Sequence, residues 1–269
     1  MSGSQIYTRK IMNRSGFVLF QPNVESMADL IDDDIDIWEE SATQQFPLGS
    51  KLYRGEQQWH YCYNGAVTGV AGAPVQSAAA VHADQDDDIV TGAAAAAGDY
   101  TIELTSTADL DTGVLATAGG LTGGYIIIND EAGEGHLYKV ADHEIFSTTD
   151  NSTITLYDPL KVALTVASQV GVIPSPFYGV IATTAVCTRM VLGCYPFAVT
   201  ASYYFWLPTG GPAACVAHAG IAVGDLVVAG TTAAKADPAA ALTTESLIGW
   251  AMTPAIADTE SFIVYIIPK

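Results

Sequence analysis

The stretch that decides the fold is YYFWLPTGGPAACVAHAGIAVGDLVVAG, residues Tyr203–Gly230. It opens with five bulky residues, Tyr203 to Leu207, whose side chains alternate between two faces if the segment is a strand. A strand with one solvent-exposed face alternates apolar with polar residues, whereas this segment is bulky on both sides. We therefore expect both faces to be covered, one of them by a neighbouring copy of the chain.

Two prolines and two glycines follow directly, in Pro208–Pro212, and predict that the strand ends there in a turn. Residues 213–216 then return as a second predicted strand. Beyond them, Gly220, Gly224 and Gly230 separate two short apolar runs. Short runs with glycine between them are typical of tightly turned β structure.

Apolar runs bounded by turn residues predict further strands in the rest of the chain. Lys51–Arg54 and Gln58–Tyr63 form a predicted hairpin around Gly55 and Glu56. The other predicted strands are Tyr100–Leu104, Tyr125–Ile128, His136–Val140, Ile154–Tyr157, Val162–Val166, Ile248–Trp250 and Phe262–Ile267. The predicted fold class is all-β, with small β-barrel or sandwich domains, tight Gly/Pro turns and an N-terminal arm that carries one short helix.

The one predicted helix lies in SMADLIDDDIDIWEE, residues 26–40. Its apolar residues are spaced to form a single stripe along a helix, and Ser26 is a suitable N-cap. The apolar stripe comprises Met27, Leu30, Ile31, Ile35 and Trp38. The aspartates between them form the predicted solvated face, with a divalent-cation site as the alternative.

The same pattern divides the chain into four segments. Residues 1–45 are the N-terminal arm, and residues 46–80 form a hairpin that we expect to pair with the C-terminal barrel. Residues 81–176 form a β-rich middle domain, which would be an insertion, and residues 177–269 form the C-terminal β-barrel. Pro174-Ser175-Pro176 marks the end of the insertion.

Composition argues against several classes of function. The chain has 29 acidic and 10 basic residues and a net charge of −19, whereas nucleic-acid binding needs clustered lysine and arginine. The sequence contains no run of about 18 or more apolar residues, so we expect no membrane-spanning helix. The four cysteines lack the spacing of a zinc site, so we expect buried thiols, no metal and no cofactor.

The usual catalytic motifs are also missing from the sequence. Asp142-His143-Glu144 lacks the second histidine of a zinc protease motif, and no G-x-S-x-G segment is present. Cys215 and His218 would face opposite ways on a strand, so they predict no catalytic dyad. A pair of carboxylates that the fold brings together stays open as an alternative. The chain is therefore expected not to be an enzyme.

The order of these elements resembles a known family. An aromatic strand, a Gly-Pro segment, a Gly-Asp-x-Val-Val turn at 224–228 and the late Ile248–Trp250 strand resemble the small β-barrels of tailed-bacteriophage head decoration proteins, also called cement proteins. FPLG at 46–49 with the hairpin after it, and LYDPLKVAL at 156–164, extend the resemblance over most of the chain.

The resemblance implies a structural virion protein that binds the outside of a phage capsid and stabilises the lattice of the major capsid protein. Such a protein would be assembled in the bacterial cytoplasm and would associate with itself, as a homotrimer. The expected oligomer interface comprises Tyr203, Tyr204, Trp206 and Trp250. The expected capsid-binding arm contributes Ile6, Tyr7, Arg9, Lys10 and Trp38. A carbohydrate- or receptor-binding head fibre or tail appendage is the alternative, because exposed Trp and Tyr suit sugar stacking.

Overall fold

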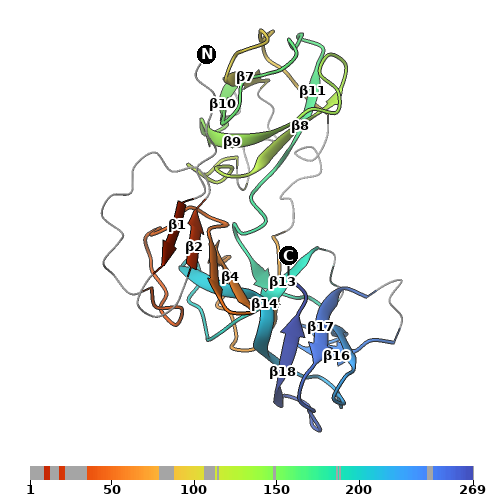
Figure 1. Cartoon of the computed structure of the whole chain (residues 1–269). Coiled ribbons are helices and arrows are strands. Elements are labelled where there is room, and N and C mark those ends of the chain that lie inside the picture. The colour runs from red at the N-terminus through yellow and green to blue at the C-terminus, as the bar shows by residue number, and fades with distance from the viewer. Residues whose placement is uncertain are drawn as a thin grey trace. The chain divides into compact units, whose positions relative to one another are not determined.

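A computed structural model describes most of the chain. The described residues are 9–12, 18–21, 35–78, 88–105, 113, 115–147, 150–185, 187, 189–240 and 245–268, with the backbone alone in the first two ranges. This part of the chain contains no helix, and its strands form three antiparallel sheets (Figure 1). The all-β fold class predicted from the sequence is confirmed.

The chain folds as two compact units. One unit combines Met1–Ala78 with Phe177–Lys269, and the other, Ala79–Pro176, is inserted between these two segments. The sequence pattern places the same insertion at residues 81–176. Pro174 and Pro176 therefore lie where the chain returns from the inserted unit to the first one.

The inserted unit is a nearly closed six-stranded barrel. Its strand order is β6-β11-β8-β9-β10-β7, and an isolated bridge between Thr91 and Leu104 links its two edges. Buried residues alternate with more exposed ones along β7 to β10, as expected when one face of each strand lines the barrel interior. The strands are β6 Ile89–Val90, β7 Thr101–Leu104, β8 Tyr125–Asp130, β9 Leu137–His143, β10 Ser152–Leu156 and β11 Gln169–Ile173.

One predicted strand of this unit is wrong. Val162–Val166 contributes only an isolated bridge from Leu164 to Ala95, and the strand that completes the barrel is β11. Leu164 is buried, while Val162 and Val166 are exposed, so the apolar run is a loop fastened at its central residue. The run alternates as a strand would, but in the described part of the chain this bridge is its only β pairing.

The first unit contains a nine-stranded sheet in the order β1-β2-β3-β4-β14-β18-β17-β15-β16 and a three-stranded sheet in the order β12-β5-β13. The strands are β1 Arg9–Met12, β2 Val18–Gln21, β3 Lys51–Arg54, β4 Gln57–Tyr63, β5 Pro74–Gln76, β12 Ile181–Ala182, β13 Val191–Cys194, β14 Tyr204–Val216, β15 Leu226–Ala229, β16 Ala236–Pro238, β17 Leu247–Ala251 and β18 Ser261–Ile266. The hairpin β3–β4 joins the C-terminal strands because β4 pairs with β14.

Strand β14 continues through Pro208–Pro212, where the sequence predicts a turn, so that prediction is wrong. Its first half pairs with β4 and its second half with β18, and the register shifts between Pro208 and Gly210. A bulge of this kind bends a strand without ending it. Gly211 has φ +78°, and a Cβ built on it would lie 2.5 Å from the carbonyl oxygen of Glu56. The glycines therefore allow a continuous strand to change partner.

Both faces of the aromatic half of β14 are covered by the chain itself. Phe205 and Leu207 pack on one side in a cluster with Val75, Leu192 and Tyr195, which belong to or follow the three-stranded sheet. On the other side, Trp206 packs with Ile37, Leu52, Trp59 and Tyr61, and with Phe46. The sequence pattern assigns one of these covers to a neighbouring copy, but residues 35–48 of the same chain provide it.

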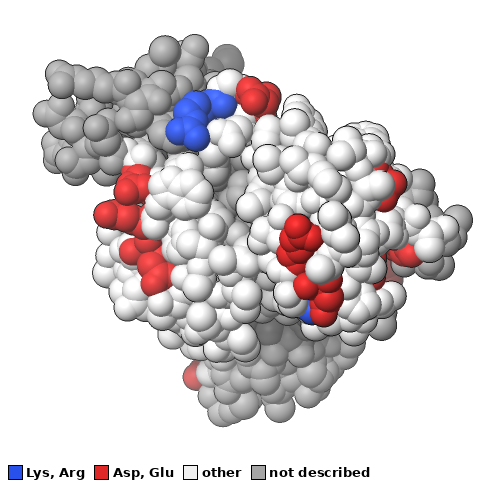
Figure 2. All heavy atoms as spheres, turned by 90° about the horizontal axis from the view of Figure 1, so that it is seen from below, with Lys and Arg blue, Asp and Glu red and all other residues white. Residues whose placement is uncertain are grey.

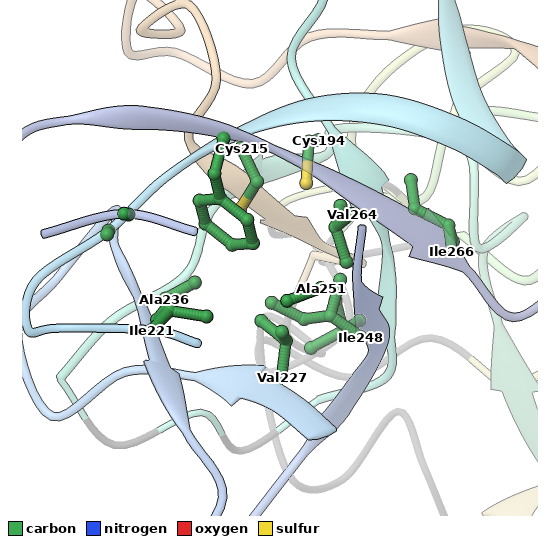
Figure 3. Close-up of a cluster of buried hydrophobic side chains, with 13 residues drawn as sticks. Cys194, Cys215, Ile221, Val227, Ala236, Ile248, Ala251, Val264 and Ile266 are labelled. Carbon is green, nitrogen blue, oxygen red and sulfur yellow. The ribbon is translucent and has the colours of Figure 1, made fainter. Parts of the chain in front are cut away.

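The C-terminal strands curl around a third cluster of buried side chains. Figure 3 shows its aliphatic residues from β14 to β18 pointing toward one another, with Cys194 and Cys215 at one side. A parallel bridge between Ala217 and Ala236 links β16 back to the segment after β14. The segment expected to form the C-terminal barrel therefore has its own apolar interior.

The predicted helix at residues 26–40 is wrong in its described part. Residues 35–40 contain a turn, and residues 26–34 lie outside the described residues. Ile37 is buried against β3 and β4, and Glu40 accepts hydrogen bonds from the backbone and hydroxyl of Thr200. These tertiary contacts override the helical spacing, which is only a weak local preference.

We expect Gly211→Ala to destabilise the protein by about 2–4 kcal/mol, because it combines a positive φ with a backbone clash. Gly224→Ala is the matched control: Gly224 has φ +87°, but no neighbouring atom lies within 4 Å of the place that a Cβ would occupy. The control should lose only about 1 kcal/mol. Urea unfolding of both variants measures the difference, and equal losses would contradict the close approach at Gly211.

His60 makes the stability of the fold depend on pH. Its ring is 1% exposed, lies 2.6 Å from Thr209 Oγ1 through Nδ1 and stacks on Phe177. Burial, and to a smaller extent Lys51, lower the pKa of His60 to about 3. The unfolded chain therefore binds a proton below about pH 6.5 that the folded chain does not, so stability falls as the pH falls from there towards 3.

For the wild type, His60 should remove about 1–2 kcal/mol of stability between about pH 7 and about pH 5. His60→Gln keeps a neutral hydrogen-bonding side chain and should lose this component of the pH dependence. Urea unfolding of both proteins at the two pH values tests it. The same pH dependence in both would show that His60 titrates normally in the folded state.

Candidate functional site

No catalytic or metal-binding constellation is evident in the described part of the chain. Its histidine, cysteine and acidic side chains form no group of three that suits a metal ion. Cys215 is buried, and burial raises the pKa of its thiol, while His218 Nδ1 lies 3.0 Å from Asp237 Oδ1. The buried thiol of Cys215 is therefore poorly suited to act as a nucleophile.

The cysteines are free thiols. Cys62, Cys194 and Cys215 are buried, and Cys187 is half-buried. Nor do the described residues contain a helix long and apolar enough to cross a membrane.

The residues expected at an oligomer interface lie in different environments. Trp206 is 2% exposed within its own chain, so it is unavailable to a partner and its assignment to the interface does not hold. Tyr203 and Tyr204 are half-buried. Trp250 is 49% exposed and lies on β17, which β18 separates from β14 in the sheet. Of the four residues, only Trp250 is exposed.

The residues expected in a capsid-binding arm are described only in part. Ile6 and Tyr7 lie outside the described residues. Arg9 and Lys10 lie on β1, which pairs with β2, and β2 pairs with β3 at the edge of the large sheet. This backbone is therefore a strand of the sheet and not a separate arm. Trp38 is 63% exposed at the turn over β3 and β4.

Trp250 lies in a row of apolar residues on the outer face of the sheet. Leu226 pairs with Trp250, Trp250 with Tyr265, and Tyr265 with Pro212, so one residue from each of four adjacent strands lies in line. Directly paired residues point to the same face, with Cβ atoms about 5 Å apart. The row therefore forms a continuous apolar strip from β15 to β14.

A second row lies two residues further along the same strands. Ile263 pairs with Ala214, and the backbone N–H of Met252 donates to the carbonyl oxygen of Ile263. Ile263 is 43% exposed and Met252 48% exposed. We call the two rows together the Trp250 face; it consists of Leu226, Trp250, Tyr265, Pro212, Met252, Ile263 and Ala214.

The Trp250 face contains no charged residue, although the whole chain carries a net charge of −19. Figure 2 shows the distribution on one side of the molecule, where carboxylates gather in separate patches with wide uncharged areas between them. Large apolar patches on a soluble protein mark places where another surface binds. The Trp250 face is therefore the first candidate site.

A cavity at the other end of β14 is the second candidate site. It has a volume of about 310 Å³, and we call it the Tyr204 pocket. Its lining consists of Ile35, Asp36, Glu39, Glu40, Ser41, Gln45, Phe46, Tyr61, Tyr204 and Trp206. Aromatic rings from β4, β14 and the segment before β3 form one part of the wall, and residues 35–41 bring carboxylates to it.

The rings in the Tyr204 pocket support one another. Tyr61 and Tyr204 stack at 5.9 Å between centroids, and Phe46 meets Tyr61 edge-on at 5.2 Å. Burial raises the pKa of Tyr61 to about 12, and it also raises the pKa of Tyr204. Both phenols therefore stay neutral at ordinary pH, and the charge of the pocket comes from its carboxylates.

Sequence reasoning identifies neither surface in full. It places Asp36 on the solvated face of a helix, and it assigns the rings of Tyr204 and Trp206 to a partner. The alternation in Gln57–Tyr63 and Tyr204–Leu207 is a usable signal, because two neighbouring strands rich in aromatics place their rings on shared faces. The missing information is that residues 35–46 fold back over them.

Comparisons of the chain with protein-family models, with curated proteins and with solved structures find no match.

Proposed function

We propose that this chain is a structural protein of a bacteriophage virion, which binds the outer surface of the capsid and stabilises the lattice of the major capsid protein. The observation that carries the proposal is the Trp250 face, a partly exposed and uncharged strip across four strands of a strongly acidic chain. It supports a function based on binding another protein surface. The capsid as the target comes from the resemblance of the turns and strands to head decoration proteins.

The charge of the chain restricts how copies can associate. Copies that each carry a net charge of −19 repel one another, and this repulsion is weakest where surfaces without carboxylates meet. Burying an indole ring such as that of Trp250 contributes about 2–3 kcal/mol before the cost of ordering. In the proposed homotrimer the Trp250 face joins the copies, and each copy then adds a separate attachment to the lattice.

A carbohydrate- or receptor-binding appendage of the virion is the second candidate. The exposed rings of Trp38 and Trp250 favour it, because flat accessible indoles suit stacking on sugars. Copy number separates the two functions: a decoration protein is present at about the number of capsid lattice positions, and an appendage in a few copies. Quantitative gel analysis of purified particles gives this number.

Trp250→Glu tests the role of the Trp250 face. It places a charge in the middle of the strip, and we expect self-association to weaken by about 30-fold or more, from the loss of about 2–3 kcal/mol. Light scattering during size-exclusion chromatography measures association, and sedimentation with expanded capsids that lack this protein measures occupancy. Both should fall.

Ile173→Glu is the matched control, because it introduces the same charge at a 52% exposed position in the inserted unit. The control should associate and bind like the wild type. If Trp250→Glu protein also retains wild-type mass and wild-type capsid occupancy, the Trp250 face is not the contact surface.

A further inference from the structure

We propose that the Tyr204 pocket binds a cationic side chain, lysine or arginine, which a partner protein presents. The pocket combines aromatic rings with carboxylates, and its lining in the described part of the chain includes no lysine or arginine. The inference goes beyond capsid attachment and does not rest on it, because it follows from the chemistry of the pocket alone.

Two of the rings are partly accessible. Trp206 and Tyr61 are 2% and 3% exposed and form the base of the wall, whereas Phe46 and Tyr204 are only partly buried. The centroid of Phe46 lies 5.2 Å from that of Trp206, so the base supports the accessible rings in fixed positions. A cation within about 6 Å of a ring centroid is attracted by the negative face of the ring.

The carboxylates at the pocket are held near these rings. Glu40 is fixed by Thr200, whose backbone N–H and hydroxyl both donate to it. Asp36 accepts a hydrogen bond from the backbone N–H of Trp38 through Oδ1, at 2.8 Å. Within the described part of the chain, Glu39 has no such bond and is exposed. Its carboxylate is therefore the one most available to an incoming cation.

The uncharged polar residues of the pocket favour a cation over a sugar. Gln45 Nε2 donates to Thr43 Oγ1 at 2.9 Å, and the hydroxyls of Ser41 and Thr43 lie within hydrogen-bond distance of each other. These groups bond to one another, whereas sugar recognition needs polar groups directed at the ligand. The volume of about 310 Å³ is at the lower end for ligand sites and suits one side-chain head group.

The experiment uses the full-length chain and three probes: a short peptide with one arginine, the same peptide with citrulline, and maltose. Citrulline has nearly the shape of arginine but no charge, so it isolates the contribution of the cation. NMR titration of ¹⁵N-labelled protein follows the indole N–H signal of Trp206. We expect a saturable shift with the arginine peptide in the millimolar range, weakened by salt, and none with citrulline or maltose.

Three variants locate the interaction. Glu39→Gln removes an exposed charge and should weaken binding about 2–3-fold, and Tyr204→Leu removes a ring and should weaken it about 3–5-fold. Tyr204→Phe is the matched control, because it keeps the ring and should bind like the wild type. Thermal unfolding verifies that each variant is folded. If the Tyr204→Leu protein does not fold, Glu39→Gln still tests the site.

Three results would overturn the inference. One is equal binding of the citrulline and arginine peptides, another is an arginine titration that leaves the Trp206 signal unchanged, and the third is a maltose shift as large as that of arginine. Capsid attachment is tested separately, since Trp250 is not among the residues that line the pocket.

Discussion

The rest of the first unit depends on the burial of β14 on both faces. Phe205 and Leu207 face a cluster beneath the three-stranded sheet, and Trp206 faces a second cluster over β3 and β4. Since successive side chains of a strand point in opposite directions, each cover is needed to keep half of the bulky residues out of water. The segment before β3 and the segments around β5 and β13 therefore have to fold against the same strand.

This requirement explains why distant parts of the sequence meet. The backbone of Ser41 exchanges hydrogen bonds with that of Tyr204, and Glu40 binds Thr200 just before the strand. Both contacts fasten the segment that covers Trp206. The same segment brings carboxylates beside the rings of β4 and β14, so the Tyr204 pocket is a consequence of how the strand is covered.

The sequence predicts many of the strands because their pattern is local, but it misses β5, β6, β11, β13 and β16. Apolar runs bounded by turn residues identify β3, β4, β7 and β18 to within one residue at each end, and Gly-rich segments mark turns. The prediction fails where a local pattern has two structural solutions. Pro208–Pro212 is typical of a turn, but only the partner strands β4 and β18 decide that it bends a continuous strand. Likewise, bulky residues on two faces require two covers without saying which segment supplies them, so the pattern alone assigns Trp206 to a partner.

Because the ring of Trp206 is covered and that of Trp250 is exposed, we expect a binding surface on β17 and not on the aromatic part of β14. Trp206 stabilises the fold, and removing it would open a cluster that includes Trp59 and Tyr61. Trp250 lies on the outer face of a sheet whose inner face already has a complete apolar interior. The apolar interior of its own unit is therefore complete without the indole ring of Trp250. A large exposed indole within an uncharged strip lowers the solubility of a chain unless another surface covers it, and this cost is the physical reason to look for a partner there.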